Sequence, residues 1–164
     1  MSAAGPPQGA KAPSGGSEVH TVTSVGACVV LDTNIALDVL VFSDPAALPL
    51  RDALAAGSLR WLATGAMRAE LARVLGYPQI MPRLAFYGMS AADVLAAFDR
   101  QSRPVDAAPK AAVTCTDRDD QIFIDLAVAH RGALLSKDRA VLKLRKRLLA
   151  LGVRVGATLD ALPG

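Results

Sequence analysis

The sequence predicts a single α/β domain, in which helices cover both faces of a mainly parallel sheet to give a three-layer α/β/α sandwich. A chain of 164 residues suits one domain, and its hydrophobic content of 52% is enough for a core. Short apolar runs alternate with amphipathic segments along the chain, which is typical of strand and helix repeats in parallel sheets. We expect this domain to cover residues 26–164.

The first residues differ in composition from the rest of the chain. The segment MSAAGPPQGAKAPSGGSEVH is rich in Gly, Pro, Ser and Ala, and it lacks the apolar core of a secretory signal. Such a composition buries too little apolar surface to fold. We therefore expect residues 1–25 to form a disordered tail.

The remaining sequence indicates a cytoplasmic protein. Charged residues or prolines interrupt every apolar segment before it reaches the ~18 residues that a membrane span needs. Cys28 and Cys115 are far apart and match no spacing typical of a zinc site or a disulfide framework. A reducing compartment and no membrane association are expected.

Helix caps and apolar patterns locate the elements of the first half. Pro45 lies in the first turn of one helix, and Gly57 follows its end. Thr64 offers an N-cap hydroxyl to the next helix, which Gly76 and Pro78 terminate. In order, we expect a strand at 28–31, helices at 34–41 and 45–56, a strand at 60–63 and a helix at 65–75.

The second half continues the alternation. Residues 79–89 fit no single pattern, whereas Ser90 caps a helix, Asp119 or Asp120 begins another, and Gly132 follows the end of the latter. In order, we expect a helix at 91–100, a loop at 101–110, a strand at 111–115, a helix at 121–130, a strand at 133–136, an amphipathic helix at 138–152 and a strand at 153–155. Val141, Leu144, Leu148 and Leu151 form the apolar face of the last helix.

Four acidic residues follow the predicted strands: Asp32, Glu70, Asp120 and Asp138. The carboxyl ends of parallel strands meet at one edge of a sheet, so we expect the four side chains to converge there. Taken singly, three of them are better explained as helix caps or first-turn acids, and Glu70 as an ion-pair partner of Arg73. Four acids at one edge are harder to explain in that way.

The predicted cluster has the chemistry of a Mg²⁺ or Mn²⁺ site. Clustered carboxylates repel one another, and oxygen ligands without His or Cys suit these hard cations. Such ions activate water for the hydrolysis of phosphodiesters. Thr33, Asn34 and Ser136 lie beside the acids and carry groups that can orient water or phosphate. We predict that the four acids are metal ligands and catalytic residues, with these three residues in support.

Three segments, VVLDTNIALDVLVF, GAMRAELARVLGYP and CTDRDDQIFIDLAVAHRGALLSKDRAVLKL, resemble the PIN-domain nucleases in order and spacing. The similarity extends over about residues 27–156 and is with the VapC-like branch, the toxin components of bacterial toxin–antitoxin pairs. It implies a PIN-like fold, Mg²⁺- or Mn²⁺-dependent endoribonuclease activity, homodimerisation and neutralisation by a small antitoxin protein. It aligns Asp32, Glu70, Asp120 and Asp138 with the four acids of the family, and Asn34 and Ser136 with its polar helpers.

Two further acids receive structural interpretations. Asp125 stands where this branch often has an acid, but it lies about 140° around the helix from Asp120, away from the predicted site. Asp38 follows Asn34 by four residues, so its side chain either faces the predicted site or, as the pattern favours, lies on a polar stripe of its helix.

Basic residues gather near the C-terminus. The net charge of +3 is too small to indicate a nucleic-acid-binding protein. Lys143, Lys146 and Arg147, however, lie together on the polar face of the last predicted helix. They form either a solvated face or a surface that contacts RNA phosphates.

Other functions fit less well. A dinucleotide-binding domain needs a Gly-x-Gly-x-x-Gly turn after the first strand, where this chain has DTNIAL. A phosphotransfer domain with an aspartyl nucleophile explains Asp32 but gives Glu70 no role. A catalytically silent PIN-like module that binds RNA or a partner stays open. A metal-dependent endoribonuclease is the function that the sequence favours.

Overall fold

The computed structural model describes residues 27–163, so the tail predicted at 1–25 lies outside the described residues. In the described part, the strands form one parallel sheet in the order β3-β2-β1-β4-β5. The strands are β1 (Cys28–Leu31), β2 (Arg60–Ala63), β3 (Ser102–Pro104), β4 (Ala133–Leu135) and β5 (Val155–Gly156).

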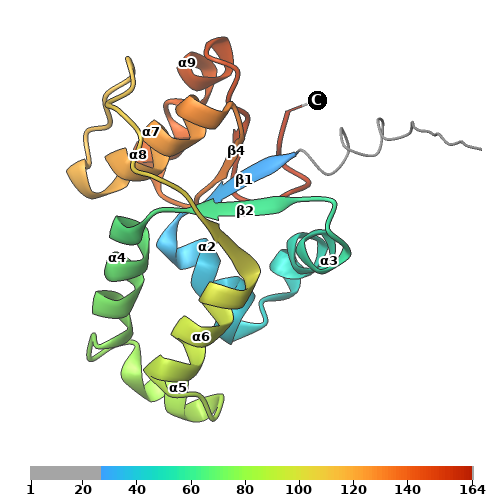
Figure 1. The fold of residues 1–164 in the computed structure, drawn as a ribbon, viewed down its shortest axis with the longest axis vertical. Coiled ribbons are helices and arrows are strands. Elements are labelled where there is room, and N and C mark those ends of the chain that lie inside the picture. The colour runs from blue at the N-terminus through green and yellow to red at the C-terminus, as the bar shows by residue number, and fades with distance from the viewer. Residues whose placement is uncertain (1–26, 164) are drawn as a thin grey trace, which may run out of the picture.

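Helices cover both faces of this sheet, as expected for the three-layer sandwich. Figure 1 shows α7, α8 and α9 on one side and α2, α3, α4 and α6 on the other. The helices are α2 (Thr33–Leu37), α3 (Leu48–Ala56), α4 (Gly65–Leu75), α5 (Met81–Phe86), α6 (Ala91–Gln101), α7 (Gln121–His130), α8 (Arg139–Leu142) and α9 (Arg145–Ala150). Across residues 27–163, every helix is too short or too polar to span a membrane.

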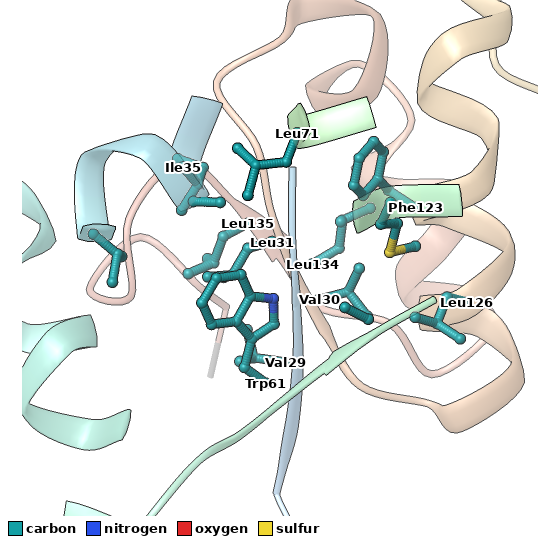
Figure 2. Packing of buried hydrophobic residues seen from close by; sticks show 14 of the residues in the cluster. Val29, Val30, Leu31, Ile35, Trp61, Leu71, Phe123, Leu126, Leu134 and Leu135 are labelled. Carbon is teal, nitrogen blue, oxygen red and sulfur yellow. The ribbon is translucent and has the colours of Figure 1, made fainter. Parts of the chain in front are cut away.

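The central strand β1 is buried on both sides. Its residues alternate between the two faces, so Val30 lies on the same side as Leu126 of α7, and Leu31 on the side of Ile35 of α2 (Figure 2). Val29 and Val30 are completely inaccessible to solvent. Such a two-sided core explains why this strand is apolar throughout, and it fixes the position of the residues that follow it.

Most of the predicted caps are present. The Thr64 hydroxyl accepts the N–H of Met67 at 3.3 Å and begins α4. Ser90 and Asp93 form a reciprocal capping box at the start of α6. Gly57 ends α3 with a φ of 78°, a conformation that glycine adopts without strain. These local signals confirm the predicted helices at 65–75 and 91–100.

The third strand lies elsewhere than predicted. The segment 111–115 buries alternate residues as a strand would, but it is not part of the sheet. Side chains of α7 bond its backbone instead of a neighbouring strand: Asp125 accepts the N–H of Ala111, and Gln121 accepts that of Cys115. The edge strand is β3, inside the predicted loop 101–110. A proline is tolerated there because only an edge strand lacks a second partner.

Several helix boundaries also differ. The helix predicted at 34–41 is the α2 segment followed by a π-helical turn, Asp38–Phe42, and the one predicted from Pro45 begins with a 3₁₀ turn before α3. The ambiguous segment 79–89 contains α5.

The prediction of a single helix at 138–152 is wrong. It is divided into α8 and α9 at Leu144, whose N–H bonds to the carbonyl of Val141 in a tight turn. Neither Gly nor Pro lies at this break, so the sequence gives no local signal for it. Leu144 and Leu148 of the predicted apolar face are nevertheless both buried. The last strand is β5 rather than 153–155.

Candidate active site

One pocket at the carboxyl ends of β1 and β4 gathers six carboxylates: Asp32, Glu70, Asp117, Asp119, Asp120 and Asp138. All four predicted acids are among them. The other residues lining the pocket, which include Thr33 and Asn34, are uncharged. Among residues 27–163, therefore, no lysine or arginine lines the pocket, and of its six acids only Glu70 has an ion-pair partner, Arg73 of the same helix.

The most compact group in this pocket is formed by Asp117, Asp120 and Asp138. One carboxylate oxygen of each lies within 4.8 Å of those of the other two. Asp117 was not among the predicted site residues. Its signal in the sequence is the run TDRDD at 116–120, where Asp117 precedes Asp120 by three residues and so falls on the same short 3₁₀ turn, Arg118–Asp120 with Asp117 as its cap.

Asp120 is the most constrained of these acids. Its side chain is at the start of α7 but caps nothing, and its Oδ2 is buried without a hydrogen-bond partner. Only 7% of the residue is exposed. Burial, a hydrogen bond shared with Asp138, and the charges of Asp32, Asp138 and Asp117 raise the pKa of Asp120 to about 8. A buried carboxylate oxygen without a structural role is an expected position for a cation ligand.

Asp32 is tied to Asp138 through a buried hydroxyl. The Ser136 hydroxyl donates to Asp32 Oδ2 at 2.6 Å and accepts the N–H of Asp138 at 3.0 Å. Asp32 Oδ1 accepts the N–H of Asn34 at 3.4 Å at the start of α2. Burial raises the pKa of Asp32, and the hydrogen bonds from Ser136 and Asn34 oppose that rise. Ser136 therefore favours the charged form of Asp32 and sets the place of Asp138.

Two of the acids in the pocket also cap the start of a helix or a 3₁₀ turn. Asp138 Oδ1 accepts the N–H of Ala140 at 2.9 Å, and Asp117 Oδ1 accepts that of Asp119 at 3.0 Å. Each carboxylate has two oxygens and about four lone-pair positions. The cap role predicted for Asp138 is thus present, and it does not prevent this side chain from binding an ion.

Glu70 lines the pocket but lies outside the compact group. Its Oε1 accepts a hydrogen bond from Arg73 within the same helix, the i,i+3 ion pair that the sequence also suggested. Asn34 is exposed on the first turn of α2, whereas Thr33 is buried beneath it. Both line the same pocket.

Two other acids have structural partners. Asp125 accepts hydrogen bonds from Ala111 N at 2.9 Å and from Gln121 Nε2 at 2.8 Å. It thereby holds the irregular segment that leads to Asp117, in agreement with its predicted place off the site face. The polar-stripe interpretation of Asp38 is wrong, because this residue is only 8% exposed and pairs with Lys137 at 2.6 Å.

The three basic residues of the predicted RNA surface lie apart from the acids. Lys143, Lys146 and Arg147 are all exposed around the break between α8 and α9. None of them lines the acidic pocket.

The comparison with protein families identifies this arrangement. Residues 28–140 match the family model of the PIN domain. The chain belongs to the PIN-domain family. Among solved structures, this PIN domain is similar to VapBC2 from Rickettsia felis bound to a DNA fragment from their promoter, with a TM-score of 0.53 and 14% identity over 78% of this chain and 98% of that chain. At that identity the likeness concerns the fold. No curated protein matches the chain in sequence.

The residues of this PIN domain fit a divalent cation. The donors of the compact group are all carboxylate oxygens, the ligand type of Mg²⁺ and Mn²⁺. The buried Oδ2 of Asp120 has no partner. Burial first, and then the neighbouring carboxylates, raise the pKa of that side chain, and a bound cation would offset both effects. Asp117, Asp120 and Asp138 are the candidate ligands, and Asp32 adjoins them.

Proposed function

We propose that this PIN domain is a Mg²⁺- or Mn²⁺-dependent endoribonuclease that hydrolyses RNA phosphodiester bonds. The observation that carries the proposal is the compact group of three carboxylates, one of which, Asp120, has a buried Oδ2 without a hydrogen-bond partner. A bound ion would lower the pKa of an attacking water and offset the charge of the scissile phosphate. Asp32, Glu70, Asp120 and Asp138 are the proposed ligands and catalytic residues, and Asp117 joins them.

The surrounding residues have distinct tasks in this proposal. Through its two hydrogen bonds, Ser136 favours the charged form of Asp32 against the effect of burial and aligns this side chain with Asp138. Asn34 and Thr33, at the N-terminal turn of α2, present amide and hydroxyl groups at the pocket, and the exposed Asn34 is placed to donate to a phosphate oxygen. The absence of lysine or arginine from the described pocket lining supports a cation as the group that attracts phosphate there.

We further propose that the enzyme is the toxin component of a toxin–antitoxin pair, acting in the cytoplasm as a homodimer and neutralised by a small antitoxin protein. The resemblance of its motifs to the VapC-like branch supports this role. Its fold is similar to that in a VapBC2 complex. Co-expression with the protein encoded by the neighbouring open reading frame tests it, because an antitoxin would restore growth that the active enzyme arrests.

The test of the activity compares matched variants of the full chain on end-labelled RNA with Mg²⁺, with Mn²⁺ and with a chelator. Asp120→Asn and Asp138→Asn should abolish cleavage, whereas Asp106→Asn should retain it, because Asp106 is exposed and outside the pocket. Cleavage that resists the chelator, or that is equal in all variants, contradicts the proposal. Binding of RNA without cleavage in every metal would favour a catalytically silent module.

A further inference from the structure

A second pocket adjoins the acidic one. Its lining residues are Asn34, Asp38, Phe42, Asp44, Arg83, Tyr87 and Lys137. Asn34 lines both pockets, and so does the segment around α5: Tyr77, Gln79 and Ile80 border the acidic pocket, and Arg83 and Tyr87 border the second. A nucleic-acid strand that extends from the acidic pocket past Asn34 therefore enters the second pocket.

The second pocket has the cations that the acidic pocket lacks. The Arg83 guanidinium carbon lies 3.6 Å from the centre of the Phe42 ring. Stacking of this kind uses the flat face of the guanidinium and leaves the N–H groups at its edge free to bind a phosphate. Lys137 is 47% exposed and contacts Asp38 at 2.6 Å, but an ammonium group has three donors. Both cations are thus positioned to contact an anion.

The carboxylates of this pocket are already engaged. Asp38 is neutralised by Lys137, and Asp44 Oδ1 accepts the N–H of Ala46 at 3.0 Å as the cap of a 3₁₀ turn. Arg83 has no carboxylate partner among the ion pairs of residues 27–163. Asp44 keeps its charge, so the acids and bases of this pocket balance. Arg83 is the basic group of the pocket that a phosphate meets without an ion-pair partner among the described residues, and the partly exposed Lys137 adds further donors.

The ring of Tyr87 lines the same pocket, and the exposed ring of Phe86 contacts Tyr87 from outside the pocket lining. Phe86 is 82% exposed and Tyr87 is 41% exposed, and their ring centroids lie 5.1 Å apart at an interplanar angle of 86°. The Tyr87 hydroxyl donates to the carbonyl of Phe42 at 3.2 Å, which fixes the ring beside Arg83. Base stacking on such rings, combined with cationic contacts to the backbone, is how proteins bind single-stranded nucleic acids.

We propose that this second pocket binds the nucleotide next to the scissile phosphate of a single-stranded RNA. Its base stacks on Tyr87 and abuts the perpendicular ring of Phe86, and its phosphate is bound by Arg83 and Lys137. The inference rests on the proposed nuclease function and adds that the substrate is unpaired at this position. A duplex keeps its bases stacked within the helix and cannot present one to these rings.

Binding is measured separately from cleavage, in the Asp120→Asn background, by fluorescence anisotropy with a labelled single-stranded RNA. We expect Tyr87→Ala, Phe86→Ala and Arg83→Ala each to weaken binding by about tenfold. Tyr87→Phe keeps the ring and should bind within about twofold of the parent. Arg100→Ala is the charge control, because Arg100 is exposed and lines neither of the two pockets.

The salt dependence separates the two kinds of contact. Arg83→Ala should reduce the slope of log affinity against log salt by about 0.7, whereas Tyr87→Ala and Phe86→Ala should leave it unchanged. Phe86→Ala removes a largely exposed ring, so it tests stacking even where Tyr87→Ala disturbs the fold. A double-stranded form of the same RNA should bind with no difference between Phe86→Ala and its parent.

Three outcomes overturn the assignment of this pocket. The unmodified chain could cleave RNA with metal while the Phe86 and Arg83 variants bind RNA as tightly as their Asp120→Asn parent. The assignment of the second pocket to RNA would then be wrong, and the proposed nuclease activity would be unaffected. If these variants change only the oligomeric state in sedimentation, the aromatic rings form a protein contact. A parent that neither cleaves nor binds RNA contradicts both proposals.

Discussion

Ser136 donates a hydrogen bond of 2.6 Å to Asp32, although the two residues are 104 positions apart in the chain. Their strands β4 and β1 are neighbours in the sheet, and Asp32 N also bonds to the carbonyl of Leu135 at 3.0 Å. The parallel pairing of two apolar strands therefore builds the first contact of the acidic pocket. The strength of that contact can be tested through the titration of Asp32.

Replacement of Ser136 by alanine should move the pH dependence of cleavage. The Ser136 hydrogen bond lowers the pKa of Asp32 against the effect of burial, so its loss raises that pKa further. The rise of kcat/KM with pH should then occur at a higher pH than in the parent. Ser136→Thr keeps the hydroxyl and should restore the parental profile. A purely structural role for Ser136 would lower activity equally at every pH.

The metal-free protein should lose stability as pH rises from about 4 to 8. The pKa of Asp120 is about 8 in the folded chain, against an ordinary value of 3.8. Over this interval the unfolded chain releases its proton while the folded chain retains it, so the free energy of unfolding falls as pH rises. Chemical denaturation at a series of pH values measures this slope, and Asp120→Asn should flatten it. A slope equal in Asp120→Asn and its parent would contradict the raised pKa.

Divalent cations should reverse that loss. Mg²⁺ or Mn²⁺ bound to the native state raises the melting temperature by mass action, and the effect should weaken at low pH because protons compete for Asp120. Asp120→Asn and Asp32→Asn should abolish the rise in melting temperature. Asp106→Asn should preserve it, since Asp106 lies outside the pocket. A parent whose melting is unaffected by millimolar metal would argue against the metal site.

The irregular segment before α7 should depend on Gln121. Its amide joins Cys115 N, Val113 O and Asp125 Oδ1 at 2.7, 3.0 and 2.8 Å. We expect Gln121→Ala to destabilise the protein by about 1–3 kcal/mol, because buried partners lose their bonds. It should also weaken Mn²⁺ binding, since this segment leads to Asp117, and calorimetry with Mn²⁺ measures that effect. Unchanged affinity in a destabilised variant would mean that Asp117 is held by its own 3₁₀ turn.

The sequence predicts the fold where local signals agree with the tertiary structure. The strands at 28–31, 60–63 and 133–136 are largely apolar runs that pair with another strand on each side, so their pattern alone identifies them. β3 carries no such pattern, because an edge strand of three residues needs little apolar surface. The segment 111–115 has the alternation of a strand, but side chains satisfy its backbone, which no local pattern reveals.

The candidate site was predictable to a similar degree. Asp32 and Asp138 stand beside strand ends, and the strand-end rule places them correctly. Asp117 was overlooked because a run of acids before a helix is explained by capping, which Asp117 does provide. Arg83 and Tyr87 belong to the ambiguous segment 79–89. Only the packing of α5 against the end of the π-helical turn, through Phe42, brings them to the site.

The basic surface near the C-terminus remains a separate proposal for the RNA path. If Lys143, Lys146 and Arg147 contact phosphates beyond the two pockets, the triple alanine variant should bind RNA more weakly at every sequence. Its salt slope should fall by about 2, at roughly 0.7 for each lost contact. Cleavage at saturating RNA should persist, because none of the three lines the acidic pocket.

The same variant has a measurable outcome if these side chains form only a solvated face. They flank the buried Val141, Leu144 and Leu148, so their removal should change the free energy of unfolding by no more than about 0.5 kcal/mol per site. Anisotropy at three salt concentrations, with Arg83→Ala measured in parallel, separates the two surfaces. An unaltered slope in the triple variant, beside a reduced slope in Arg83→Ala, would place the RNA on the α5 side of the acidic pocket and leave α8 and α9 to support the core.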